Sequence, residues 1–186
     1  MSIFSIHTPE TAPEAARPIL DGAKRKFGFV PNLLGALAEA PAALEGYVAL
    51  SDILAKSSFT PAEREVVTIA VSAKNGCAYC VAAHSTLAAM HKVPEDVITA
   101  LRDRRAIDDP RLEALRAFAE TLVEKRGWAS DEDVQAFLAA GFTRAQALEV
   151  VLGVAFKTLS NYANHLVDTP VDAAFAPRAW SADEAS

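Results

Sequence analysis

Apolar residues recur at helical spacing along nearly the whole chain, and no stretch shows the strict alternation of a half-buried β-strand. Capping residues, prolines and glycines divide this pattern into successive amphipathic segments. The pattern therefore predicts an all-α fold. After an extended arm at residues 1–10, we expect helices at about 13–26, from Pro41 to about Lys56, from Thr60 to Asn75, from Cys77 to about His91, a short one from Pro94, and then from Pro110 to Arg126, from Ser130 to Gly141 and from Thr143 onwards.

The clearest helix start is the run Thr60-Pro-Ala-Glu63. It combines an N-cap threonine, a proline at the first helical position and a glutamate that completes a capping box. The helix that follows carries Glu65 and is expected to stop at Asn75-Gly76, a pair typical of turns. Gly28 is expected to end the first helix in the same way.

Two segments of the chain share one spacing. Glu65-Val66-Val67 lies twelve residues before Cys77-x-x-Cys80, and Glu149-Val150-Val151 lies twelve residues before Asn161-x-x-Asn164. This echo predicts a duplicated helix pair in which only the first copy holds thiols, with chance similarity of two alanine-rich helices as the alternative. The second copy has a polar cluster that either lines the site or supplies caps and buried hydrogen bonds: Ser160, Asn161, Tyr162, Asn164 and His165.

The only cysteines of the chain are Cys77 and Cys80, with His84 four residues later and Glu65 twelve residues ahead. Cysteines at i and i+3 lie on one face of a helix, and His84 extends that face by a turn. A thiol reacts as the thiolate, so His84 could accept its proton while Glu65 orients the histidine or receives the proton onward. Once one cysteine is oxidised to a sulfenic acid, the other can close a disulfide. These four residues predict a dithiol redox centre.

Other interpretations of the cysteines stay open on this reasoning alone. The thiols could be small buried apolar groups, or they could bind zinc with His84 and Glu65. If they are redox-active, we expect Cys77 to be the more acidic thiol, because unpaired N–H groups and the helix dipole favour an anion at a helix start. Tyr79 either donates a hydrogen bond in the pocket or packs as an aromatic side chain.

The overall composition excludes several classes of protein. With 186 residues, 51% of them hydrophobic, the chain can form one domain with a sizeable core. A formal net charge of -6 and the lack of a Lys/Arg run with interleaved aromatics argue against a nucleic-acid partner. No apolar run is long enough to cross a bilayer and no secretory signal is present, so we expect a cytoplasmic protein without a membrane partner. In the cytoplasm a CxxC pair is typically redox-active or metal-bound.

Within the single predicted domain, we expect a helical extension at residues 1–56, a core repeat region at 57–168 and a flexible tail at 177–186. The motif Glu65-x11-Cys77-x-x-Cys80-x-x-x-His84, inside VSAKNGCAYCVAAH, resembles the AhpD-like alkylhydroperoxidase and carboxymuconolactone decarboxylase superfamily. The match is strongest over about residues 60–91. FGFVPNLLGALAEAP and SNYANH resemble the longer peroxidase-related branch, so the resemblance covers most of the chain.

The resemblance implies an all-helical fold with an internal duplication, a trimeric or hexameric assembly, and reduction of organic hydroperoxides without cofactor or metal. By that likeness Cys80 is the peroxidatic cysteine, Cys77 resolves it, and Glu65 and His84 relay the proton that activates Cys80. The chain departs from the AhpD pattern at Tyr79, where the family has a second histidine, and this puts efficient AhpD-type turnover in question. The decarboxylase branch lacks the CxxC, so lactone decarboxylation is disfavoured.

We therefore predict a thiol peroxidase that is regenerated by an external dithiol. The departure at Tyr79 motivates a second hypothesis, a disulfide oxidoreductase or redox sensor with little peroxidase turnover. A third is a non-enzymatic zinc-binding or structural helical oligomer. The side chains expected to surround the four catalytic candidates are Tyr79, Asn161, Asn164 and His165.

Overall fold

Helices make up the whole regular structure of this computed structural model, which describes residues 3–183 and contains no strand within that range. The predicted all-α class is confirmed. The α-helices are α1 (Arg17–Phe27), α2 (Asn32–Leu37), α3 (Pro41–Leu54), α4 (Pro61–Lys74), α5 (Ala78–Met90), α6 (Glu95–Arg102), α7 (Pro110–Glu124), α8 (Asp131–Ala139) and α9 (Arg144–Val167), with short 3-10 turns η1 (Glu14–Ala16) and η2 (Ala176–Arg178).

The predicted helix signals lie where the sequence places them. Thr60 Oγ1 accepts a hydrogen bond from the Glu63 backbone N–H at 3.2 Å, and the Thr60 N–H donates to the Glu63 carboxylate at 2.8 Å. This capping box satisfies two N–H groups that have no partner inside the helix. At the other end of a helix, Gly28 closes α1 with a φ of 81°, a left-handed conformation that favours glycine.

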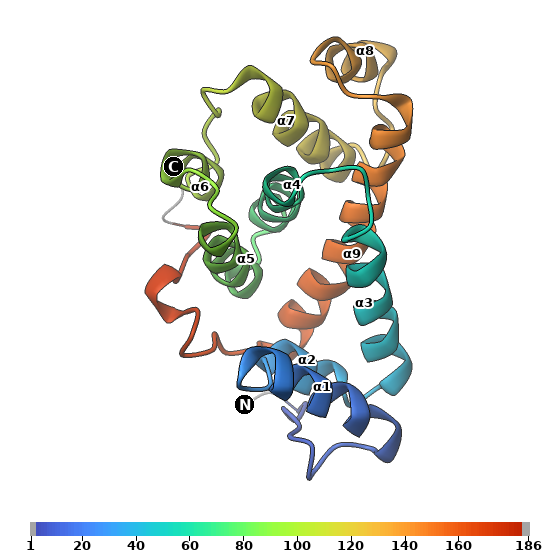
Figure 1. Cartoon of the computed structure of the whole chain (residues 1–186), viewed down its shortest axis with the longest axis vertical. Helices are drawn as coiled ribbons and strands as arrows, with labels where there is room; N and C mark the ends of the chain where they lie inside the picture. The colour runs from blue at the N-terminus through green and yellow to red at the C-terminus, as the bar shows by residue number, and fades with distance from the viewer. Residues whose placement is uncertain (1–2, 184–186) are drawn as a thin grey trace.

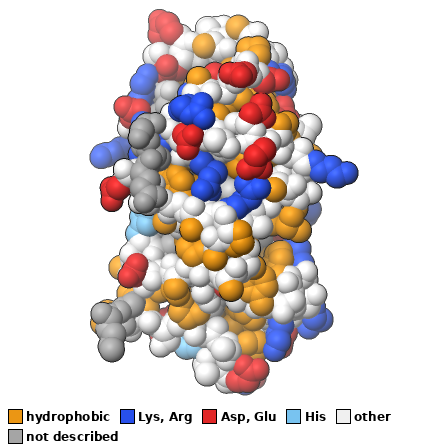
Figure 2. All heavy atoms as spheres, turned by 90° about the vertical axis from the view of Figure 1, so that its left-hand side faces the viewer, with side chains coloured by type: hydrophobic (Ala, Val, Ile, Leu, Met, Phe, Trp, Pro, Cys, Tyr) orange, Lys and Arg blue, Asp and Glu red, His pale blue; other side chains and the backbone are white. Residues whose placement is uncertain are grey.

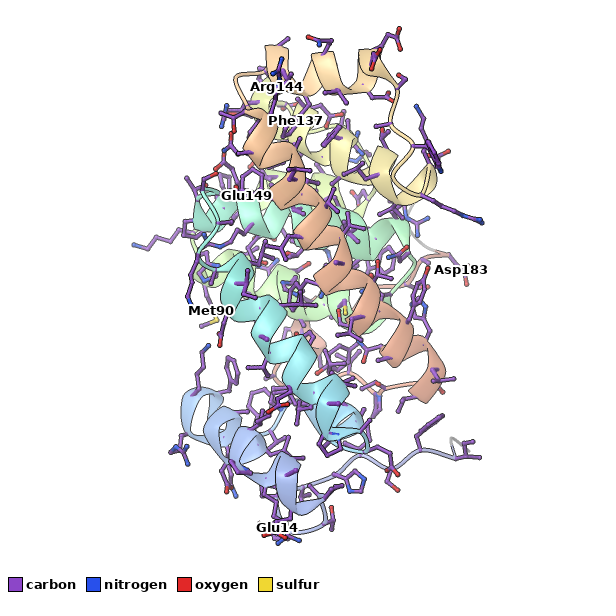
Figure 3. All side chains as sticks on the ribbon, turned by 90° about the vertical axis from the view of Figure 1, so that its right-hand side faces the viewer. Glu14, Met90, Phe137, Arg144, Glu149 and Asp183 are labelled. Carbon is purple, nitrogen blue, oxygen red and sulfur yellow. The ribbon has the colours of Figure 1, made fainter. Side chains whose placement is uncertain are left out.

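Helix α4 lies at the centre of the molecule, and α5, α7 and α9 pack around it (Figure 1). Helix α9 runs along one side of the bundle from the α8 end to the α1–α3 end. Figure 3 views the molecule from that side, with Arg144 and Glu149 on the first turns of α9 and Phe137 on α8. Since α9 spans the length of the bundle, its buried face can reach side chains of several helices at once.

Two apolar clusters form the core. One is built mainly from α4, α6, α7, α8 and the first half of α9. The other brings α1, α2 and α3 against the start of α5, and Cys77 and Cys80 belong to it. The predicted N-terminal extension therefore supplies part of the apolar wall around the thiols.

The two segments that share the Glu-Val-Val spacing differ in structure at the break between α4 and α5. Gly76 has a φ of 71° and turns the chain, so α5 packs back against α4. The equivalent positions of the second copy, Leu159 and Ser160, lie inside the continuous helix α9. Glu149 consequently faces the loop before α4, where its carboxylate accepts hydrogen bonds from the backbone N–H and hydroxyl of Ser58 at 2.9 and 2.6 Å. The two copies share a spacing but not a local geometry, because only the first has a glycine at the turn.

The C-terminal segment crosses the outside of α5 and α6. Arg102 donates to the carbonyls of Arg178 and Ala179 at 2.8 Å each, and the Trp180 indole donates to the Arg102 carbonyl at 2.7 Å. Figure 2 shows this face, where apolar side chains gather across the middle and lower part of the molecule. In its described part, the segment expected as a flexible tail makes these contacts with α6; its flexibility stays a prediction, and residues 184–186 lie outside the described range.

Within residues 3–183, no single helix combines the length and apolar character needed to cross a bilayer. Helices α8 and α9 meet that requirement only when taken together, as a pair bent by 110°.

Candidate thiol site

The two cysteines lie at the start of α5. Cys77 is the N-cap residue, with extended backbone (φ -85°, ψ 95°), and Cys80 lies in the first turn. Both are free thiols, and each is only 1% exposed. The break at Gly76 and the start of α5 therefore hold the pair together inside the core.

Helix α9 provides polar contacts to both sulfur atoms. The Asn164 side-chain amide donates to Cys80 Sγ at 3.2 Å and lies 3.8 Å from Cys77 Sγ. Ser160 Oγ lies 3.7 Å from Cys80 Sγ. The structure thus brings the predicted neighbour Asn164 to the thiols, and it adds Ser160 from the same polar cluster. Hydrogen bonds from an amide to a sulfur atom stabilise the thiolate over the thiol.

His84 and Glu65, predicted from the motif, are in direct contact. His84 Nδ1 lies 2.9 Å from Glu65 Oε2, and Glu65 also accepts from the Thr68 hydroxyl at 3.2 Å. The second carboxylate oxygen, Oε1, lies 3.1 Å from His91 Nδ1. The side chain of His91 is 44% exposed, whereas that of Glu65 is 8% exposed. These contacts form a continuous chain of titratable groups from the buried site to the surface.

Two members of the site were missed by sequence reasoning. Lys157 on α9 is completely buried, and its Nζ lies 2.9 Å from His84 Nε2. The signal available was spacing: Lys157 precedes Ser160 and Asn164 by three and seven residues, which puts all three on one helix face. His91, the C-cap residue of α5, likewise lies one heptad after His84.

The two thiols differ sharply in acidity. Burial alone would raise the pKa of Cys80, but the hydrogen bond with Cys77 and the positive charge of Lys157 outweigh it and hold that pKa well below its ordinary value. The pKa of Cys77 is raised, because its thiol is hydrogen-bonded to Cys80 and because it is buried beside the Cys80 charge. The expectation that the helix dipole makes Cys77 the more acidic thiol is therefore wrong. Directed contacts with a thiol neighbour and a buried cation outweigh a dipole effect that is typically below 1 kcal/mol.

Three further side chains were predicted to surround the catalytic candidates: Tyr79, Asn161 and His165. Tyr79 points away from them: its hydroxyl donates to Asp172 Oδ2 at 2.5 Å and accepts from the Leu33 N–H at 3.3 Å. Asn161 joins α9 to α4, donating to Ser72 at 3.3 Å and accepting from Asn75 at 2.9 Å. His165 is corrected as a site neighbour. It is exposed and stacks on Tyr162, because its position falls on the outer face of α9.

The zinc interpretation does not fit the contacts of His84. Its Nδ1 is engaged by Glu65 and its Nε2 by Lys157, so neither ring nitrogen is free to bind a metal. Among the residues that the structure describes, no three His, Cys, Asp or Glu side chains converge as a metal site would require.

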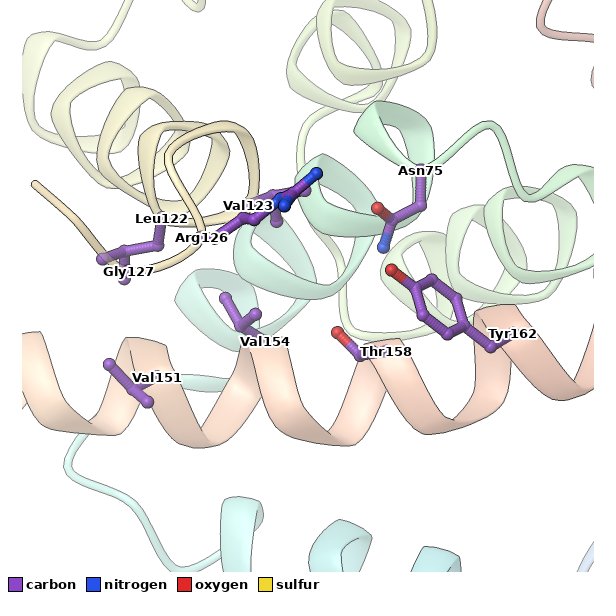
Figure 4. Close-up of a pocket in the computed structure, with 9 residues that line it drawn as sticks. All are labelled: Asn75, Leu122, Val123, Arg126, Gly127, Val151, Val154, Thr158 and Tyr162. Atoms are coloured by element: carbon purple, nitrogen blue, oxygen red, sulfur yellow. The ribbon is translucent and has the colours of Figure 1, made fainter.

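A separate pocket of about 280 Å³ lies between the end of α7 and the outer side of α9 (Figure 4). Its walls are mainly apolar and include none of the residues around the thiols: they are Asn75, Leu122, Val123, Arg126, Gly127, Val151, Val154, Thr158 and Tyr162. The thiol chemistry is therefore not located in this surface pocket.

The chain is similar to known proteins in both sequence and structure. Residues 41–121, which contain Glu65, both cysteines and both histidines of α5, match the model of the carboxymuconolactone decarboxylase family. The structure superposes with a TM-score of 0.82 and 27% identity, over 94% of both chains, on the alkylhydroperoxidase AhpD core of an uncharacterized peroxidase-related protein from Ralstonia eutropha JMP134. The chain has the AhpD-like fold, and its residues 41–121 match the carboxymuconolactone decarboxylase family.

Further structures share the AhpD-like fold. A peroxidase-related protein from Silicibacter sp. TM1040 is 21% identical, with a TM-score of 0.79 over 93% of this chain and 92% of that one. The debrominase Bmp8 without ligand is 19% identical, with a TM-score of 0.79 over 100% of this chain and 99% of its own. A cysteine-to-alanine variant of Bmp8 has been solved in complex with 2,3,4-tribromopyrrole. No curated protein matches this chain.

Proposed function

We propose that this AhpD-like protein is a thiol-dependent peroxidase that reduces organic hydroperoxides through Cys80 and Cys77, with Glu65 and His84 as a proton relay. The observation that carries the proposal is the geometry of the site: two adjacent buried thiols lie beside the Asn164 amide, with the Glu65–His84 pair and the buried Lys157 next to them. These surroundings lower the pKa of Cys80 and raise that of Cys77, which favours Cys80 as the nucleophilic thiolate. This is the division of labour that a peroxidatic and a resolving cysteine require.

The proposed reaction has two steps. The Cys80 thiolate attacks the outer oxygen of R–O–OH, so an S–O bond forms, the O–O bond breaks and the departing alkoxide takes up a proton to give the alcohol. Cys77 then attacks the sulfenic sulfur, so an S–S bond forms and the hydroxyl leaves as water with the Cys77 proton. An external dithiol returns two electrons and two protons and restores the reduced pair.

Several contacts support a small organic substrate. Asn164 Oδ1 is buried and has no hydrogen-bond partner among the described residues, so an acceptor for the hydroperoxide O–H lies on the same amide that contacts Cys80. Tyr47 stacks on Phe156 with ring centroids 5.0 Å apart, and Phe156 meets His84 edge-on at 6.3 Å. These rings give the site an aromatic wall that suits an apolar R group.

The two alternative redox functions differ in their support. Thiol–disulfide exchange with a protein partner is disfavoured because each cysteine is 1% exposed and exchange requires a partner sulfur in line with the attacked one, so we expect the dithiol that regenerates the pair to be a small molecule. Reductive dehalogenation uses the same dithiol: a carbon–bromine bond is replaced by carbon–hydrogen, bromide leaves, and the two thiols become a disulfide. The aromatic wall beside His84 favours testing it, since a flat ring can pack there.

The test is a stopped-flow titration of reduced protein with cumene hydroperoxide, with free thiols counted after each addition. We expect one peroxide to remove two thiols per chain. In Cys77→Ser one thiol is lost and a sulfenic acid can be trapped with dimedone, whereas in Cys80→Ser peroxide consumption falls to the background rate. Unchanged consumption by Cys80→Ser would refute the mechanism. Absence of thiol loss with peroxide, combined with bromide release from 2,3,4-tribromopyrrole, would replace peroxidase activity by dehalogenation.

A further inference from the structure

Lys157 is a buried lysine without a carboxylate partner. It is 0% exposed, and none of the ion pairs among the described residues includes it. Its Nζ contacts His84 Nε2 at 2.9 Å and lies 4.9 Å from the centre of the Phe156 ring. Burying an ammonium group costs several kcal/mol unless an anion compensates it. An ammonium group at this position therefore needs a compensating anion within the site itself.

The hydrogen bonds fit one assignment of the charges. With Lys157 as an ammonium group, which has only donors, His84 Nε2 accepts from it and carries no proton of its own. The proton of the ring is then on Nδ1 and is donated to Glu65 at 2.9 Å. This pattern makes His84 a neutral imidazole and puts the positive charge on Lys157, because two cations at 2.9 Å would repel each other.

The groups that face Cys80 come from four helices. On α5 they are Cys77 and His84, and on α4 the nearest charge is Glu65. On α3 the group is Tyr47, whose pKa is raised by burial and by the charges of Cys80 and Glu65. On α9 they are Ser160, Asn164 and Lys157, and the last is the only one of these side chains that is a cation in the assigned hydrogen-bond pattern.

We propose that the Lys157 ammonium group is the positive charge that holds Cys80 as a thiolate, and that it is the acid that protonates the departing alkoxide. The second half rests on the proposed peroxidase function; the first half does not. His84 positions the ammonium group by accepting its hydrogen bond, and Glu65 fixes the tautomer of His84, so Lys157 is the member of the Glu65–His84 relay that holds the proton next to the reacting atoms.

With this assignment, every proton in the reaction cycle is accounted for. The reduced site starts as the Cys80 thiolate, the Lys157 ammonium group and the Cys77 thiol. When the O–O bond breaks, Lys157 gives its proton to the alkoxide, and Cys77 gives its proton to the water that leaves as the disulfide forms. Lys157 is then neutral when the thiolate that needed its charge is gone. Reduction by a dithiol returns one hydrogen to Cys77 and one proton to Lys157.

The experiment follows the pH dependence of Cys80 alkylation by iodoacetamide, which needs no peroxide. The background variant is Cys77→Ser, which leaves one thiol and keeps a hydrogen-bond donor at position 77. We expect its alkylation rate to stay constant from pH 9 down through neutral pH. Adding Lys157→Met should move the titration above pH 8.5, the ordinary thiol value, and lower the rate at pH 7 at least tenfold.

An internal control distinguishes the loss of the Lys157 charge from a change in how easily iodoacetamide reaches Cys80. At a pH where Cys80 is fully ionised in both proteins, the two alkylation rates should converge, which shows that methionine has not closed the route to the thiol. With cumene hydroperoxide at that same pH, the Lys157→Met variant made in the otherwise native chain should still react about 100-fold more slowly, because the acid is missing. An unchanged alkylation profile in the Lys157→Met variant would overturn the proposal.

A second measurement covers the case in which the variant does not fold. In native protein labelled with ¹³C at the lysine ε-carbon, alkylation of Cys80 removes the thiolate and should shift one buried lysine resonance. No lysine resonance responding to that alkylation would refute the pairing. If the charge pairing holds but native protein consumes no peroxide, the peroxidase proposal fails alone; if peroxide is consumed and the pairing is absent, the role of Lys157 fails alone.

Discussion

The contact between α9 and α4 can be tested at Gly153, which lies on the buried face of α9. A Cβ atom at this position would meet Val67 Cγ1 of α4 at 2.6 Å, far inside the 3.5–4.0 Å at which carbon atoms normally pack. Val67 is 1% exposed, and a β-branched side chain in a helix has one strongly preferred rotamer, so it cannot turn aside. We therefore predict that Gly153→Ala forces the two helices apart.

The magnitude follows from two opposing effects. Replacing glycine by alanine inside a helix favours the helix by about 0.8–1.0 kcal/mol. Overpacking a filled core costs about 1–3 kcal/mol. A matched control is Gly46→Ala in α3, where a Cβ atom would meet nothing within 4 Å, so only the favourable effect operates. The free energy of unfolding should therefore be about 1–3 kcal/mol lower for Gly153→Ala than for Gly46→Ala.

The assay is urea denaturation of both variants under reducing conditions, with thermal melting as a second readout. For a chain of this length each kcal/mol corresponds to about 2–4 °C in Tm. Gly153 precedes Lys157 by one helical turn, so displacing α9 should also lengthen the Lys157–His84 contact and raise the pH at which Cys80 titrates. If Gly153→Ala proved as stable as Gly46→Ala, the argument that α9 is held against α4 by close backbone approach would be refuted.

Two further predictions concern the neighbours of the thiols. Tyr79→Phe removes the hydroxyl that joins Asp172 and the Leu33 N–H, so it should lower the free energy of unfolding by about 1–3 kcal/mol while leaving the pH profile of Cys80 alkylation unchanged; a shifted profile would give Tyr79 a role in the thiol chemistry. Burial raises the pKa of Glu65, but the hydrogen bonds from His84 and the Thr68 hydroxyl and the charge of His91 lower it below its ordinary value. The pKa of Glu65 is lower in the folded state than in the unfolded state, so its ionised carboxylate stabilises the folded protein above about pH 4.3, the unfolded-state pKa. This stabilisation is lost as the pH falls toward the folded-state pKa. Native protein should thus lose stability more steeply than Glu65→Gln in urea titrations below about pH 4.3, and parallel curves in that range would contradict this.

Much of the fold is determined by residues that are close together in the chain. The capping boxes at Thr60, Ser130 and Thr143 each join a hydroxyl to the backbone N–H three residues later, and Gly28 needs only its own φ. Such contacts depend on local geometry alone, so the pattern predicts where helices begin and end. The contact between Glu65 and His84 can also be predicted from the sequence, because the Asn75-Gly76 turn folds α5 directly back onto α4.

The chemistry of the site depends on contacts that no local pattern contains. Lys157 meets His84 across 73 residues of sequence, and Asn164 meets Cys80 across 84. Both contacts exist because α9 runs unbroken along the bundle and turns one face toward the start of α5. The sequence by itself determines the all-α class, the helix ends and the thiol pair. Only the packing of α9 brings the buried Lys157 and the Asn164 amide to Cys80, and through space they add to the hydrogen bond with Cys77 that favours the Cys80 thiolate.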